Sequence, residues 1–142
     1  MHPRLASPPD PPPPPRPCLV LYDGACGWCT GWVRWLARRD RAGCFAFAPL
    51  EGTTASLYLD GPAPPDTLVV VERAGAGVRL SCHSEAVFRA LRRLGGPWRA
   101  LAALAVVPRP LTDWGYRLVA TRRHRLPGRP CPLPPDRDAF WP

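Results

Sequence analysis

Residues 18–49 read CLVLYDGACGWCTGWVRWLARRDRAGCFAFAP, and this stretch decides the fold. It opens with an apolar, strand-forming run at 18–22, followed by an Asp-Gly pair that favours a tight turn. From Cys26 the apolar residues recur at helical spacing, and the arginines fall largely on the other face. A second apolar run, 44–48, ends before a proline. The stretch therefore predicts a buried strand, an amphipathic helix and a second, parallel strand, joined by a right-handed connection.

The rest of the chain predicts an antiparallel pair of strands and more helices. Residues 67–72 are typical of a strand, and a Gly-rich turn returns the chain into 78–81 as an antiparallel partner. Ser84 is a suitable N-cap for a helix over 85–94. A short helix within 54–59 and two longer ones over 97–107 and 110–122 are also expected. The order β-α-β then β-β-α is that of a thioredoxin-like α/β fold, here with extra C-terminal helices.

The chain length of 142 residues suits one domain. The 22 prolines gather mainly towards the two ends, and a polyproline run cannot join a helix or a central strand. The sequence thus predicts a proline-rich disordered tail over 1–17, a thioredoxin-like domain over 18–126 and an irregular proline-rich tail over 127–142.

Two absences bear on the location of the protein. The N-terminal residues contain no apolar run that would serve as the core of a signal peptide, so export by that route is not expected. The most apolar later stretch, 101–107, is far shorter than the ~20 residues that cross a bilayer. The sequence therefore predicts a cytoplasmic protein without a transmembrane segment. Six cysteines in such a chain favour catalysis or metal binding over a structural disulfide framework.

The net charge is +8, and all 19 residues counted as lysine or arginine are arginine. Clustered arginines bind the phosphates of nucleic acids or of anionic membranes. Lysine normally shares that work, so its complete absence instead indicates a bias in codon composition. We therefore interpret the charge as solvated surface and expect no nucleic-acid partner.

The motif Cys26-Gly27-Trp28-Cys29 lies where the first predicted strand ends and the helix begins. The first turn of a helix has unpaired N–H groups and a partial positive charge, which stabilise a thiolate over a thiol. Because the thiolate is the attacking species in disulfide exchange, we expect Cys26 to be the nucleophile. Cys29, about one turn further along, is placed to attack the mixed disulfide at Cys26 and is expected to be the resolving thiol.

Three neighbouring residues are candidates for supporting roles. Gly27 leaves the backbone free to close the small disulfide ring. Trp28 is expected beside the entrance, as a substrate contact or partial lid, or else as a residue that packs on the surface. Asp23 is a candidate to take or relay a proton from Cys29 if it is buried. The alternative for Asp23 is an Asp-Gly turn that serves geometry alone.

Zinc binding is the main competing chemistry at this motif. A structural zinc site needs four ligands, and one Cys-x-x-Cys supplies two. Other thiols and imidazoles are available but form no second matching pair; they are Cys44, Cys82, His83, His124 and Cys131. Cys44 falls in a predicted strand and Cys18 begins one, so both are expected to be small buried hydrophobic residues. Cys131 is a candidate for an extra thiol at the site, and we expect no bound metal.

Residues 22–29, YDGACGWC, resemble the signature of the DCC family of thiol–disulfide oxidoreductase-like proteins, which is named for an Asp-Cys-Cys pattern. The resemblance covers roughly 19–131 and includes 47–50, 84–87, 108–116 and the Arg-rich stretch to Gly128 and Cys131. It implies a thioredoxin-like fold and protein-disulfide reductase activity, with Asp23, Cys26 and Cys29 matching the naming residues. Tyr22 and Gly24 join Gly27 and Trp28 as candidate substrate contacts.

The position of the prolines before the third predicted strand differs slightly from that in thioredoxins. They place a cis-proline before a strand opposite the cysteines, whereas Pro64 and Pro65 precede the predicted strand by one residue more than that pattern has. Pro65 remains a candidate for this role and for a substrate contact.

The leading interpretation is a thiol–disulfide oxidoreductase that exchanges disulfides with a protein or a small thiol through Cys26 and Cys29. It draws electrons from an unidentified donor and needs no bound cofactor. One alternative is a non-catalytic thioredoxin-like domain whose Arg-rich helices, 97–125, dock on an acidic partner or a membrane surface. Another is a zinc-binding module. Complete loss of function in Cys26→Ser is expected from the first interpretation, and normal function from the second.

Overall fold

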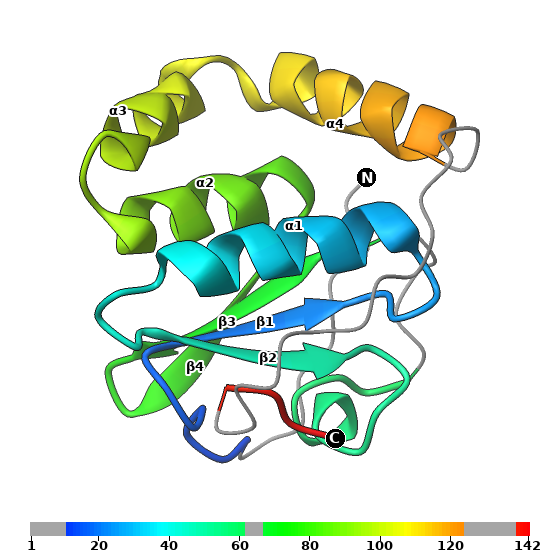
Figure 1. Ribbon diagram of the computed structural model, residues 1–142, viewed down its shortest axis with the longest axis vertical. Coiled ribbons are helices and arrows are strands. Elements are labelled where there is room, and N and C mark those ends of the chain that lie inside the picture. Colours follow the sequence, from blue (N-terminus) through cyan, green and yellow to red (C-terminus); the bar gives the residue numbers. More distant parts are fainter. Residues whose placement is uncertain (1–10, 62–66, 124–138) are drawn as a thin grey trace.

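The computed structural model describes residues 11–61, 67–123 and 139–142 (Figure 1). In chain order, the elements are β1 (Cys18–Tyr22), α1 (Gly27–Arg39), β2 (Phe45–Pro49), the 3-10 helix η1 (Ala55–Leu57), β3 (Val69–Ala74), β4 (Gly77–Cys82), α2 (His83–Leu94), α3 (Trp98–Ala102), the 3-10 helix η2 (Ala103–Val106) and α4 (Arg109–Arg123). The four strands form one sheet of order β2-β1-β3-β4, in which β1 and β2 are parallel and the other pairs antiparallel. This arrangement confirms the predicted thioredoxin-like α/β fold with additional C-terminal helices.

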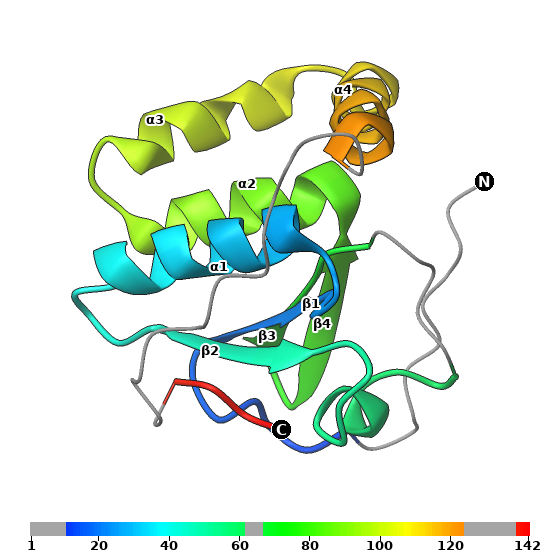
Figure 2. The same ribbon diagram turned by 45° about the vertical axis from the view of Figure 1, so that its right-hand side comes forward.

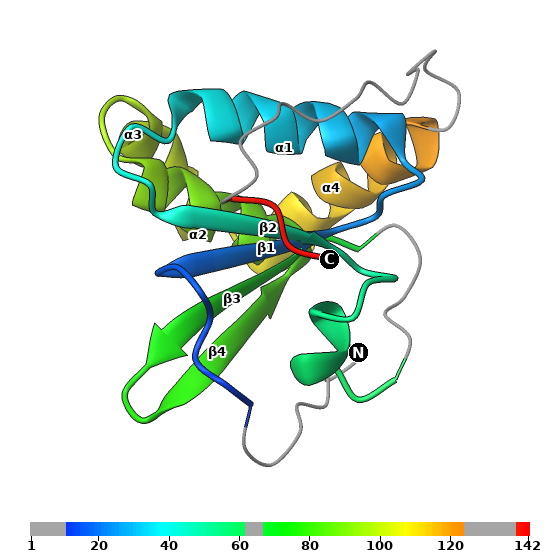
Figure 3. The same cartoon turned by 60° about the horizontal axis from the view of Figure 1, so that its bottom comes forward.

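The helices form two layers on one face of the sheet. Helices α1 and α2 lie against the sheet, and α3 and α4 form an outer layer beyond them (Figures 1 and 2). Figure 3 shows η1 on the opposite face. Strand β1 is buried on both faces, because Val20 packs with α1 and α2 while Leu19 and Leu21 pack with Tyr58 beside η1. A strand covered on both faces needs apolar residues throughout, which explains the uninterrupted run at 18–22.

The helix boundaries differ from the sequence expectation at two places. The helix expected over 97–107 is divided into α3 and η2. Helix α2 begins at His83 with Cys82 as its N-cap, so the prediction of Ser84 as the cap was wrong. The Ser84 side chain is used elsewhere, in a contact with α4. No helix in the described ranges is both long enough and apolar enough to cross a membrane.

Both ends of the described chain contact the β2 edge of the sheet, which the sequence did not predict. Phe140 forms an isolated parallel bridge with Phe47, and the N–H of Trp141 donates to the Phe47 carbonyl at 2.8 Å. Arg16 Nη1 donates to a backbone carbonyl of β2 at 3.0 Å. These contacts cover an edge strand that would otherwise expose unpaired backbone groups. The division of the chain at residues 17 and 126 stays a prediction.

Some arginines bind carboxylates instead of forming only a solvated surface. Glu72 of β3 is 6% exposed, and Arg89 Nη1 and Arg93 Nε of α2 donate to its two oxygens at 2.9 and 2.8 Å. Burial by itself would raise the pKa of Glu72, but the hydrogen bonds from Arg93 and Arg89 outweigh burial and hold this pKa below its ordinary value. This cluster fastens α2 to the sheet.

Glu72→Gln is expected to lower the free energy of unfolding at neutral pH by about 1–2 kcal/mol, because the ion pairs are lost while solvent partly screens Arg93. The folded-state pKa of Glu72 is depressed, so its stabilisation is present above the unfolded-state pKa and is lost as the pH falls through the folded-state value. Urea unfolding should therefore separate variant and wild type at neutral pH and bring them together in acid. Glu51→Gln, at an exposed carboxylate, is the control. A Glu72→Gln difference that persists in acid would contradict this assignment.

Candidate active site

The Cys-Gly-Trp-Cys motif follows a tight turn between β1 and α1. The N–H of Ala25 donates to Asp23 Oδ1 at 2.9 Å, and the N–H of Cys26 donates to the Asp23 carbonyl at 3.2 Å. A Cβ added at Gly24 would stand 3.5 Å from the Glu51 carboxylate, so the turn passes close to a neighbouring loop. The Asp-Gly pair thus bends the chain and places Cys26 at the start of the helix.

Cys26 is the N-cap residue of α1, and its sulfur accepts a hydrogen bond from the backbone N–H of Cys29 at 3.5 Å. The two cysteines are 7% and 5% exposed. The sulfur of Cys26 thus lies at the unpaired N–H groups and partial positive charge that the first turn of a helix carries. The two cysteines are therefore held near each other at a helix start, as the sequence predicted.

An apolar cavity of about 260 Å³, which we name the Cys29 groove, lies beside Cys29. Residues from α1, α2, α4 and the chain before β3 line it, and none is charged; they are Trp28, Cys29, Trp32, Leu68, Val87, Gly115, Tyr116 and Val119. Trp28, one of the lining residues, is 49% exposed. Since a dry cavity of roughly 150 Å³ admits benzene, the Cys29 groove has room for one large apolar side chain.

Comparison with known proteins assigns the chain to a family. The family model described as DCC1-like thiol-disulfide oxidoreductase matches residues 20–129. The chain belongs to this DCC1-like family. Membership confirms the resemblance noted in the sequence and suggests a redox function.

Two relatives agree with the family assignment. The uncharacterized protein YuxK of Bacillus subtilis (strain 168) is 30% identical over 122 residues, which are 82% of this chain and 86% of YuxK. A chloroplastic DCC family protein of Arabidopsis thaliana is 30% identical over 116 residues, which are 78% of this chain and 65% of the plant protein. No solved structure gave a significant match.

The candidate substrate contacts of this DCC1-like chain have different settings. Gly24 and Trp28 are exposed, and Gly27 is half-buried at the start of α1. Tyr22 is only 3% exposed and belongs to the core beneath α1. Burial raises the pKa of Tyr22, and the charge of Glu51 raises it further. Tyr22 therefore packs in the core beside Cys26 and Cys29.

Asp23 has the turn-forming geometry that the sequence allowed. It is half-buried, and its carboxylate accepts the N–H of Ala25 within the turn. A role in proton transfer stays a prediction. Pro64 and Pro65, the candidates for a cis-proline, lie outside the described residues.

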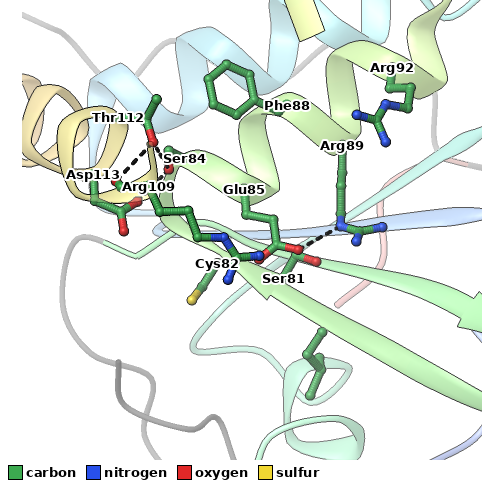
Figure 4. A pocket seen from close by; sticks show the side chains of 11 residues that line it. Ser81, Cys82, Ser84, Glu85, Phe88, Arg89, Arg92, Arg109, Thr112 and Asp113 are labelled. Carbon is green, nitrogen blue, oxygen red and sulfur yellow. Dashed lines mark hydrogen bonds and ion pairs between the residues drawn. The ribbon is translucent and has the colours of Figure 1, made fainter. Parts of the chain in front are cut away.

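Polar contacts attach α4 of the DCC1-like domain to the first turns of α2. The Ser84 hydroxyl donates to the Asp113 carboxylate, and Arg109 Nη2 donates to Glu85 Oε2 at 3.1 Å. Figure 4 shows these side chains around a second cavity of about 290 Å³, whose lining includes charged side chains. These contacts position α4, and with it one wall of the Cys29 groove.

His83 connects this region with the Cys29 groove. Its φ of 55° lies in the left-handed region, which is uncommon for a residue other than glycine. The His83 N–H donates to the Leu68 carbonyl at 3.3 Å, and its ring packs edge-on against Tyr116 with centroids 5.5 Å apart. Leu68 and Tyr116 both line the groove, so His83 braces two of its walls.

The other described cysteines are poorly suited to exchange. Burial raises the pKa of the Cys18 thiol far above its ordinary value, and it also raises the pKa of Cys82. A raised pKa leaves little thiolate to react. Cys18 is fully buried, as predicted, whereas Cys44 is half-buried. Within the described ranges, no three His, Cys, Asp or Glu side chains gather to hold a metal ion, and His124 and Cys131 lie outside those ranges.

The sequence pointed to Cys29 and Trp28 but missed the other walls of the Cys29 groove. Gly115 carried one usable signal, because an isolated glycine inside a predicted helix costs about 1 kcal/mol relative to alanine and often has a packing or functional reason. Tyr116 and Val119 carried no such signal, because helical spacing marks an apolar face of a helix but does not show which element packs against that face.

Proposed function

We propose that this protein is a thiol–disulfide oxidoreductase that reduces protein disulfides, with Cys26 as the nucleophile and Cys29 as the resolving thiol. The observation that carries the proposal is the hydrogen bond of 3.5 Å from the Cys29 N–H to the Cys26 sulfur at the N-cap of α1. This bond favours a thiolate at Cys26 and keeps the second cysteine within one turn of it. Family membership supports the same redox class.

The exchange balances in two steps. The Cys26 thiolate attacks one sulfur of the substrate disulfide, forms an S–S bond with it and releases the other substrate sulfur as a thiolate. Cys29 loses its proton and attacks the Cys26 sulfur, which releases the remaining substrate thiolate and leaves a Cys26–Cys29 disulfide. Two electrons pass to the substrate, and a thiol donor must return them before the next turnover. No bound cofactor takes part.

We assign Asp23 to receive the proton that Cys29 loses. Its half-buried position, in the turn that directly precedes Cys26, supports this assignment. The exposed Gly24 and Trp28 and the backbone of Gly27 are proposed to contact the substrate.

The Cys29 groove supplies the substrate-binding part of the proposal. Its uncharged lining and its volume of about 260 Å³ suit a large apolar side chain next to the substrate cysteine. A protein disulfide offers such a side chain, whereas a small polar disulfide does not. Proteins are therefore the preferred substrates. A cytoplasmic location stays a prediction, and the plant relative is a chloroplastic protein.

Equilibration in dithiothreitol redox buffers tests the proposed disulfide. The wild-type chain is expected to form one reversible disulfide that protects Cys26 and Cys29 from alkylation, as mass spectrometry of peptides would show. Cys44→Ser should retain this disulfide, because Cys44 lies at the opposite end of β1 and β2 from the motif. Alkylation of both motif cysteines at every buffer ratio would overturn the proposal.

A further inference from the structure

The outward side of α4 carries large apolar side chains that are exposed to different degrees in the described chain. Leu111, Trp114 and Leu118 are 59%, 63% and 37% exposed. Their spacing of three and four residues places them on one face of the helix. Helix α4 is in the outer layer of the molecule, as Figures 1 and 2 show. We name these three side chains the α4 stripe.

The α4 stripe is distinct from the side of α4 that faces the domain. That inner side contributes Gly115, Tyr116 and Val119 to the Cys29 groove, and Asp113 to the contact with Ser84. The packing of the domain therefore explains one apolar side of α4 but leaves the α4 stripe without a function.

Positive charge borders the α4 stripe. At about 100° per residue, Arg117 falls on one side of the stripe and Arg122 on the other, and both are exposed. Arg99 of α3 is exposed in the same outer layer. Asp113, the only acidic residue between Pro97 and Arg123, is engaged by Ser84. The outer surface is thus both apolar and basic.

We propose that the α4 stripe docks this protein on an anionic phospholipid surface. Leu111, Trp114 and Leu118 enter the boundary between headgroups and acyl chains, and Arg117 and Arg122 meet the lipid phosphates. Charge complementarity favours this partner, because an anionic bilayer offers phosphates to the exposed arginines and, directly beneath them, an apolar boundary to the stripe. Tryptophan also suits this boundary, since its ring is apolar and its N–H is polar.

In the docked orientation, the membrane lies on the opposite side of α4 from the Cys29 groove. The α4 stripe is on the outer side of the helix that walls the Cys29 groove, so the groove stays on the protein side of α4. Docking therefore concentrates the redox site at a membrane surface. Vesicle binding does not require disulfide exchange, so the docking proposal stands or fails separately from the proposed activity.

Flotation of the full-length chain with vesicles tests the proposal. Vesicles of phosphatidylcholine with about one third phosphatidylglycerol should bind the protein, pure phosphatidylcholine should not, and salt near 0.5 M should weaken binding. Each of Leu111→Ser, Trp114→Ser and Leu118→Ser should weaken binding about tenfold, because each removes one inserted apolar side chain. Arg117→Gln and Arg122→Gln should each weaken it about fivefold.

Matched controls lie away from α4. Leu57 belongs to η1 on the opposite face of the sheet (Figure 3) and is 49% exposed, and Trp141 lies at the β2 edge and is 44% exposed, so Leu57→Ser and Trp141→Ser remove similar apolar surface. Both control variants should bind anionic vesicles like the wild type. No binding to anionic vesicles, or equal losses in control and stripe variants, would overturn the proposal. So would a dimer in sedimentation velocity that Trp114→Ser dissociates, because a second copy would then cover the stripe.

Discussion

Cys26→Ser is expected to lower the rate of protein-disulfide reduction by about a thousandfold or more, whereas Cys29→Ser is expected to trap the substrate on Cys26. The first change removes the sulfur that accepts the Cys29 N–H at the helix start, and a serine hydroxyl does not replace a thiolate. The second change keeps the nucleophile but removes the group that releases the mixed disulfide. Insulin reduction measures turnover, and non-reducing electrophoresis with mass spectrometry detects the trapped adduct.

The different outcomes expected for Cys26→Ser and Cys29→Ser distinguish the proposed roles of the two cysteines from general misfolding. General misfolding would lower turnover in both variants without producing an adduct in either. Cys44→Ser is the matched control because its thiol is half-buried and remote from the motif, and it should turn over normally. Turnover that survives Cys26→Ser, or an adduct that maps to another cysteine, would contradict the assignment of the nucleophile.

Gly115→Leu is expected to reduce insulin turnover by roughly 10- to 100-fold while leaving reduction of glutathione disulfide nearly unchanged. A Cβ added at Gly115 would meet nothing within 4 Å, so a leucine enters the Cys29 groove without pressing on the backbone. It takes the space of a substrate side chain whose burial contributes about 1.5–3 kcal/mol to binding. Comparing kcat/KM for the two substrates measures the effect.

Gly31→Leu is the control for Gly115→Leu. Gly31 is also within a helix and also has nothing within 4 Å of an added Cβ, but it does not line the groove. Replacing either glycine raises helix propensity by about 0.8–1 kcal/mol, so both variants should unfold at higher temperature. Equal losses of insulin turnover in the two variants would show that the groove does not bind substrate. Loss of glutathione disulfide reduction as well would instead indicate damage to the thiol pair.

The predictable part of the fold depended on residues close together in the chain. The apolar run at 18–22, the Asp-Gly turn and the change to helical spacing at Cys26 occupy adjacent positions, and each matches the structure. The hairpin of β3 and β4 was equally local, because Gly75 at its turn has the positive φ of 62° that glycine adopts freely.

The α2 boundary was mispredicted because capping is not decided by local preference alone. Ser84 has the side chain of a good N-cap, but Asp113 on α4 competes for its hydroxyl, and the helix begins at His83 instead. The interpretation of the arginines as solvated surface was incomplete for a similar reason. Arg89 and Arg93 bind Glu72, and this carboxylate is far from both arginines in the sequence.

The sequence by itself determined the β-α-β unit and the position of Cys26 and Cys29 at a strand–helix junction, because turn chemistry, periodicity and the N-terminal end of a helix act over a few neighbouring residues. Only the tertiary structure decided that α4 walls the Cys29 groove, that a basic and apolar face of α4 points outward, and that residues 139–142 cover the β2 edge. These outcomes depend on which surfaces meet when elements far apart in the chain pack together, and a periodic pattern marks an apolar face without naming its partner.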